Sequence, residues 1–148
     1  MRISAKARYG FAALIEIARA SKHGDVISAQ RISEKLGISK VFLDQVAASL
    51  KKAGIIQATK GPKGGYRLAL PMDEISAFAV LEAVEHTFLE KAAPTVAEKA
   101  PTIEIALHEQ LFDKLDQAVF ACLSGVTIGN LLEHVDAQGD DHAYMLYM

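Results

Sequence analysis

The chain has 148 residues, a hydrophobic content of 51% and a net charge of −2 at pH 7, so it can bury a core and is not intrinsically disordered. It contains no span of about 18 apolar residues and no apolar run after its basic start, which predicts a cytoplasmic protein without a membrane partner. The single cysteine, Cys122, excludes a disulfide framework and is typical of a reducing compartment.

Charge is distributed unevenly between the two halves. Residues 1–70 contain 13 Lys and Arg against four Asp and Glu, a formal charge of +9. Residues 71–148 contain three Lys against 14 Asp and Glu, a formal charge of −11. The first half therefore attracts polyanions and the second half repels them.

Residues 2–20 form the first expected helix, because apolar residues recur there at helical spacing. Its apolar side consists of Ile3, Ala7, Phe11, Leu14, Ile17 and Ala18. This side is expected to pack behind the two helices that follow, while Arg2, Lys6 and Arg8 are candidates for phosphate contacts. Residues 21–26 form a surface turn.

Residues 28–54 predict two short helices joined by a tight turn. Ser28 is a suitable N-cap for a helix that ends at Gly37, and Ser39 is a suitable N-cap for a second helix over 40–53. The buried face of the second helix is expected to contain Leu43, Val46, Ala47 and Leu50. Two capped helices joined in this way are typical of a helix-turn-helix.

The opposite face of the second helix carries short or polar groups that could meet base edges. These residues are Lys40, Val41, Asp44, Gln45 and Ala48. The cap at Ser39 directs free N–H groups at the helix N-terminus toward a phosphate or a groove.

After Gly54, residues 55–59 and 66–70 are expected to form two strands. The tip between them, residues 60–65, contains three glycines and two lysines. A hairpin directly after a helix-turn-helix is a wing. Each part has an ordinary explanation, since capped helix pairs, turn glycines and exposed lysines are all common. Their joint occurrence in this order favours a DNA-binding module.

In the acidic half, Ser76 caps a helix expected to end near His86 and to bury Phe78, Leu81 and Val84. Residues 87–102 form a long loop, which is usually functional or disordered. A last short helix follows Thr127 and ends at Val135. The tail includes Tyr144, Met145, Leu146 and Tyr147, which is more apolar than a free tail requires.

The longest helix is expected over 102–123, because it carries two adjacent apolar stripes. One stripe is Leu107, Leu111, Leu115, Ala118 and Cys122, and the other is Ile105, Phe112, Val119 and Leu123. So wide an apolar arc requires two neighbours. Little other helix remains in this half, which favours a two-fold dimer through the same helix of a second subunit. Burial within its own domain is the alternative.

Five segments together resemble the Rrf-two family of dimeric winged-helix regulators. They are Met1–Gly10, Leu43–Gln45, Lys51–Ile56, Lys60–Tyr66 and Val126–Leu131, with the glycine-rich wing and its Tyr the most specific. The resemblance implies a mainly α fold with a small β-hairpin. It also implies a winged helix-turn-helix domain over 1–71, an effector and dimerisation region over 72–137, and a tail over 138–148.

The resemblance further implies a homodimeric transcription regulator, most simply a repressor, which binds a pseudo-palindromic operator through helix 40–53 and wing 60–66. The expected DNA contacts are Arg2, Ser28, Ser39, Lys40, Val41, Phe42, Asp44, Gln45, Lys60, Gly61, Lys63, Gly64 and Tyr66. Leu107, Leu111, Leu115, Val119 and Cys122 are expected at the dimer interface. Asp44 stands where the family commonly has Glu, so its side chain is shorter. Lys60 stands where the family often has Arg, so it lacks the guanidinium group that can make two parallel hydrogen bonds.

Family members with an iron–sulfur cluster hold it with three cysteines in the loop before the long helix. In this chain residues 90–101 contain no cysteine, and Glu109 replaces the ligating His, with His108 one position away. Because such clusters require thiolates, we expect no iron–sulfur cluster, no other metal and no cofactor.

Cys122 is expected to be a packed, inert thiol, with a redox sensor or an intersubunit ligand as the alternatives. No catalytic constellation is visible, so an enzyme is not expected. A small-molecule or protein effector could act through the 87–102 loop. The rival to a DNA-binding regulator is a protein-binding adaptor whose output passes through a partner protein.

Overall fold

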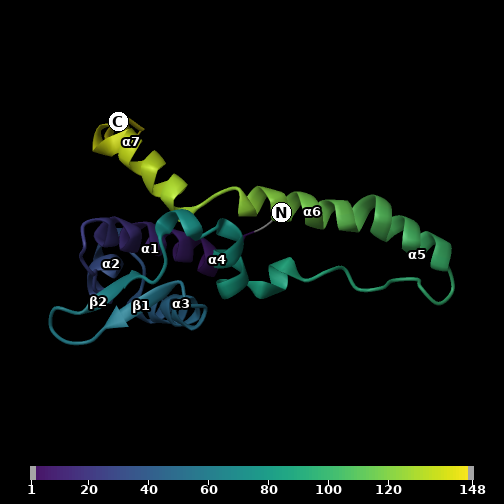
Figure 1. The fold of residues 1–148 in the computed structure, drawn as a ribbon, viewed down its shortest axis with the longest axis horizontal. Coiled ribbons are helices and arrows are strands. Elements are labelled where there is room, and N and C mark those ends of the chain that lie inside the picture. The colour runs from purple at the N-terminus through teal and green to yellow at the C-terminus, as the bar shows by residue number, and fades with distance from the viewer. Residues whose placement is uncertain (1–2, 147–148) are drawn as a thin grey trace.

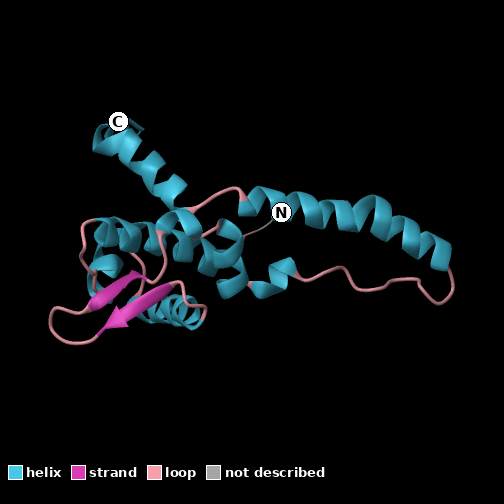
Figure 2. Cartoon of the chain, viewed as in Figure 1, coloured by secondary structure: helices cyan, strands magenta, loops and turns pink. Residues whose placement is uncertain are grey.

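The computed structural model describes the backbone of residues 3–146 and the side chains of residues 3–139. It confirms a mainly α-helical fold with one small β-hairpin (Figure 2). The predicted contact of Arg2 and the side chains of the apolar tail lie outside the described residues. In chain order the elements are α1 (Ala5–Lys22), α2 (Ala29–Leu36), α3 (Lys40–Lys52), β1 (Ile56–Thr59), β2 (Gly65–Leu68), η1 (Met72–Glu74), α4 (Ala77–Val84), η2 (His86–Leu89), α5 (Pro101–Leu107), η3 (His108–Phe112), α6 (Asp113–Ser124) and α7 (Ile128–Leu146).

The helix-turn-helix consists of α2 and α3, and both of its predicted caps are confirmed. The Oγ of Ser28 accepts a hydrogen bond from the Arg31 N–H at 3.2 Å, and the Oγ of Ser39 accepts one from the Phe42 N–H at 3.2 Å. Gly37 follows α2 in the left-handed conformation with φ 67°, which favours glycine. These local interactions define where each helix begins and ends.

Helix α1 begins three residues later than expected, at Ala5. Ser4 has an extended backbone and its Oγ accepts a hydrogen bond from the Ala7 N–H at 3.1 Å, so Ser4 is the N-cap and Ile3 precedes the helix. The predicted packing side is correct, since Ala7, Leu14 and Ile17 are buried.

The wing is an antiparallel hairpin in which Ile56 pairs with Leu68 and Thr59 pairs with Gly65. A further pair of backbone hydrogen bonds joins Ile27 and Tyr66, at 3.0 Å and 2.8 Å. The hairpin is therefore attached to the segment that precedes α2, which holds the wing against the helix-turn-helix.

One hydrophobic core is built from α1, α3, α4 and the start of α7. Leu14, Val46, Leu81 and Leu132 are each at most 1% exposed and belong to the same cluster. Ser76 caps α4 as predicted, and Leu81 and Val84 are buried, but Phe78 is only partly buried. The core thus receives side chains from well beyond residue 71.

The helix expected over 102–123 is present as three continuous segments, α5, η3 and α6, rather than as one regular α-helix. Its middle segment, η3, is a π-helical turn. The three segments form a long arm that extends away from the body, as Figure 1 shows in green. Helix α6 meets the body through α4, where the rings of Phe78 and Phe120 lie edge to face with centroids 4.9 Å apart.

The last helix is longer than predicted. Thr127 and Asn130 cap its start reciprocally, with both hydrogen bonds at 3.0 Å, and α7 continues through Leu146. Its regular geometry is interrupted at Gly139, where φ is 63° and ψ is 176°. The expected end at Val135 was wrong, since the helical conformation persists up to Gly139.

Candidate nucleic-acid interface

The outer surface of α3 carries the side chains predicted to face base edges. Lys40, Val41, Asp44, Gln45 and Ala48 are all exposed. The opposite surface is buried against the core, as the apolar spacing predicted. Helix α3 therefore presents one polar face that no part of the described chain covers.

Phe42 has a different position from the other predicted α3 contacts. Its ring is partly buried against the core and lies edge to face with Tyr9 of α1, with centroids 5.4 Å apart. The Phe42 ring therefore belongs to the packing contact between α3 and α1. Tyr9 was missed from sequence, although Phe42 stands four residues before the buried Val46, which indicated a position beside the core.

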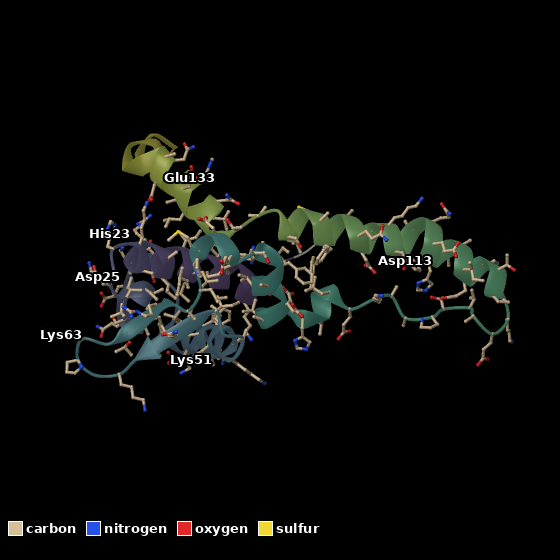
Figure 3. The ribbon with its side chains drawn as sticks, viewed as in Figure 1. His23, Asp25, Lys51, Lys63, Asp113 and Glu133 are labelled. Atoms are coloured by element: carbon tan, nitrogen blue, oxygen red, sulfur yellow. The ribbon has the colours of Figure 1, made fainter. Side chains whose placement is uncertain are left out.

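The wing tip carries Lys60 and Lys63, both exposed. Figure 3 shows Lys63 at the outer end of the hairpin, away from the helical body. Gly61 has φ 105°, which favours glycine, so one of the predicted wing contacts has a backbone role.

Gly64 and Gly65 are needed for a different reason, which is close approach of backbone segments. A Cβ on Gly64 would lie 2.0 Å from the Thr59 carbonyl oxygen, and a Cβ on Gly65 would lie 2.5 Å from the Ile27 carbonyl carbon. Neither of these close contacts was predicted from the sequence. Both glycines let the wing fold tightly on itself and on the segment before α2.

Tyr66 anchors the wing to the core. Its ring is partly buried against the core, and burial raises the pKa of its hydroxyl, with the negative charge of Asp44 raising the pKa further. Asp44 of α3 and Tyr66 of β2, which were predicted separately as DNA contacts, therefore influence each other electrostatically.

Lys6 and the two capping serines have partners within the chain. The Nζ of Lys6 donates to the Oγ of Ser49 at 3.3 Å, and Ser28 and Ser39 use their Oγ atoms in the caps described above. Arg8, Lys40, Lys60 and Lys63 remain exposed on this part of the molecule.

The loop between η2 and α5 is attached to the arm by Glu104. This carboxylate is 8% exposed and accepts hydrogen bonds from the Thr95 N–H at 3.1 Å, the Val96 N–H at 2.7 Å and the Nε2 of His108 at 3.0 Å. The hydrogen bond from Val96 is the largest cause of a lowered Glu104 pKa, while burial opposes it.

The donors of this region do not fit an iron–sulfur cluster. Residues 90–100 offer no thiolate, and Cys122 lies near the far end of α6. The carboxylate of Glu104 already holds the loop against α5. Within residues 3–139, no group of three His, Cys, Asp or Glu side chains is arranged to hold a metal ion.

The predicted dimer stripe lies uncovered on the arm. Leu111 and Leu115 are 54% and 52% exposed, and Leu107 and Val119 are partly exposed. Cys122 is exposed as well, so the expected packing of its thiol does not occur within one chain.

None of the described helices is both long and apolar enough to cross a membrane.

A helix-turn-helix followed by a hairpin wing, carried on a basic half-chain, defines a winged-helix DNA-binding protein. Comparison with known proteins identifies the family: residues 3–134 match the Rrf2 (Rrf-two) family, described as iron-dependent transcriptional regulators. The chain belongs to this family and is a DNA-binding transcription regulator, not an enzyme. The family description includes iron, whereas the donor set here lacks the thiolates that a cluster requires.

Relatives and a solved structure agree with this assignment. The chain is 40% identical to IscR of Cereibacter sphaeroides over 88 residues, which are 59% of this chain and 57% of that protein. It is 30% identical to CymR of Bacillus subtilis over an alignment of 149 positions that covers 100% of both chains. The solved structure of B. subtilis CymR, a global cysteine regulator, covers 91% of this chain and 98% of its own with a TM-score of 0.74 and 26% identity.

Proposed function

We propose that the protein is a cytoplasmic homodimeric repressor that binds a pseudo-palindromic operator in double-stranded DNA without an iron–sulfur cluster. The observation that carries this proposal is the uncovered polar face of α3 beside a wing with two exposed lysines. In this arrangement α3 enters the major groove and the wing contacts the adjacent backbone or minor groove.

The chemistry of the α3 face suits base recognition. The amide of Gln45 can pair with the N6 and N7 atoms of adenine, and the carboxylate of Asp44 can accept a hydrogen bond from cytosine N4. Lys60 and Lys63 neutralise phosphates, which adds affinity that does not depend on sequence. Free N–H groups at the capped N-terminus of α3 favour a further phosphate contact.

The arm supports the homodimer. Leu111 and Leu115 are half-exposed on a helical segment that has only one buried residue, so a second copy of the same arm would cover them. A two-fold axis through paired arms would place two α3 helices on half-sites in successive major grooves. Such a dimer would repress by covering a promoter.

The proposal can be tested by titrating duplex DNA with the full-length protein and two variants. Lys60→Ala should weaken binding to specific and random duplexes alike and lower the slope of log affinity against log salt by about one per protomer. Gln45→Ala should relax the preference at one base position and cost about 1–3 kcal/mol on the specific duplex only. The duplex would be selected from a random pool, and binding followed by fluorescence anisotropy at several salt concentrations.

Lys114→Ala is the matched control, because Lys114 is an exposed lysine on α6 that donates to Gln110 at 3.0 Å. It should leave both affinities unchanged. Equal losses on specific and random DNA for both test variants would contradict the assigned roles. A protein-binding adaptor would show neither sequence preference nor salt-dependent binding in the same titration.

A further inference from the structure

Val41 is an apolar side chain with no packing partner to explain it. It is 71% exposed, the highest fraction among the exposed large hydrophobic side chains of the described residues. Most of the others lie on the arm, where a second subunit would cover them. Val41 instead stands among the exposed polar residues Lys40, Asp44 and Gln45 of α3.

The needs of the helix do not account for a valine at this position. Valine has a lower helix propensity than lysine, glutamine or alanine, and its branched Cβ is restricted in a helix. Val41 is the second residue of α3, directly after the cap formed by Ser39. Side chains in a helix tilt toward its N-terminus, so Val41 projects over the end of α3 that enters the groove in the proposed complex.

The major groove offers one kind of apolar group to such a side chain. Base edges there present hydrogen-bond donors and acceptors, except for the C5-methyl group of thymine. A valine among hydrogen-bonding neighbours can gain free energy at this surface by covering that methyl group and excluding water from it. Lys40, Asp44 and Gln45 supply the polar contacts around it.

We propose that Val41 packs against the C5-methyl group of a pyrimidine, a thymine in unmodified DNA, at one position of each operator half-site. Val41 is then a specificity-determining residue, and it selects a base by an apolar contact rather than by hydrogen bonds. This inference rests on the proposed function, because it requires α3 to lie in the major groove.

The test uses the full-length dimer and the duplex selected from a random pool. Each thymine is replaced in turn by deoxyuridine, which lacks the methyl group but keeps every hydrogen-bonding atom. At one position per half-site this replacement should weaken wild-type binding by about fourfold. In Val41→Ala the loss at that position should shrink to less than about twofold. Placing cytosine at the same position should weaken wild-type binding, and 5-methylcytosine should recover part of the loss.

Val135→Ala is the matched control, because Val135 is an exposed valine on α7, 37% exposed and outside the helix-turn-helix. It should respond to deoxyuridine as the wild type does. The inference is overturned if no deoxyuridine substitution weakens wild-type binding, or if the loss is the same in Val41→Ala. If the wild type selects no sequence at all, the proposed function fails with it. If the wild type selects a sequence but no deoxyuridine replacement weakens its binding, only the proposed role of Val41 is contradicted.

Discussion

The body and the arm of this protein satisfy the need to bury apolar surface in opposite ways. In the body, α1, α3 and α4 each bury one face, and Leu14, Val46 and Leu81 are at most 1% exposed. In the arm, residues 101–124, the one buried residue is Glu104, while Leu111 and Leu115 remain half-exposed. The body therefore buries its apolar side chains through its own contacts, whereas the arm leaves its apolar stripe uncovered within one chain.

Charge separates the helix-turn-helix and its wing from the rest of the molecule. Of the 16 basic residues, 13 lie in residues 1–70, which contain the helix-turn-helix and the wing, and 14 of the 18 acidic residues lie in residues 71–148, which contain α4, the arm and α7. Figure 3 shows Lys63 on the wing and Asp113 on the arm, on opposite sides of the body. A polyanion is therefore attracted to the helix-turn-helix and the wing rather than to the acidic second half of the chain. This separation favours DNA binding through the helix-turn-helix and the wing.

The largest expected effect comes from paired leucine truncations, one in each region. Leu14→Ala removes a fully buried side chain and should lower the free energy of unfolding by about 2–5 kcal/mol at any protein concentration. Leu111→Ala should weaken the proposed association of two arms. The midpoint of thermal unfolding should then depend less on protein concentration than it does in the wild type. Thermal unfolding over a hundredfold range of concentration separates the two. If the unfolding midpoint of the wild type does not vary with protein concentration, the proposed association through the arm is contradicted.

A smaller effect is expected where the wing packs on the body. Gly65→Ala places a Cβ 2.5 Å from the Ile27 carbonyl and should destabilise the protein by about 1–3 kcal/mol. Gly125→Ala, at the end of the arm, is the control, because its Cβ would lie at an ordinary 3.4 Å from the Ala121 carbonyl oxygen. Urea denaturation should show little change for the control. Similar urea midpoints for both variants would mean that the wing can move away from Ile27 without a loss of stability.

The smallest effect is local and depends on pH. Because the folded state lowers the pKa of Glu104 below its ordinary 4.5, the stabilising contacts with the 94–100 loop are complete above that value and are lost as the pH falls through the lower folded pKa. The titratable groups beside it are His108 and, on the other side of the His108 ring, Asp113. Amide chemical shifts of Thr95 and Val96 should therefore titrate at acidic pH.

In Glu104→Gln this acidic titration of the two amides should disappear, since an amide side chain does not ionise. Glu109→Gln is the control, because Glu109 lies exposed on the same arm and should leave the titration intact. Persistence of the titration in Glu104→Gln would show that another group holds the loop.

Interactions between residues close in sequence were predictable. Ser28, Ser39 and Ser76 cap helices where expected, and Gly37 ends α2, because a cap joins groups only a few residues apart. The buried faces of α1 and α3 followed from helical spacing. The exposed α3 residues of the candidate site were found by the same spacing.

Contacts between distant residues were not predictable in this way. The pairing of Phe42 with Tyr9, the packing of Gly65 on Ile27 and the capture of the loop by Glu104 each depend on the path of the chain between the partners. A single sequence contains the partners but not the distance between them.

Residue types and their local spacing were enough to predict the order of elements, the caps of α2, α3 and α4, the charge separation and the resemblance to winged-helix regulators. Three features became visible only in the folded chain: the wing is attached to the segment before α2, α7 completes the core, and the arm extends uncovered from the body. The reason is that long-range packing selects among many arrangements that satisfy the same local preferences.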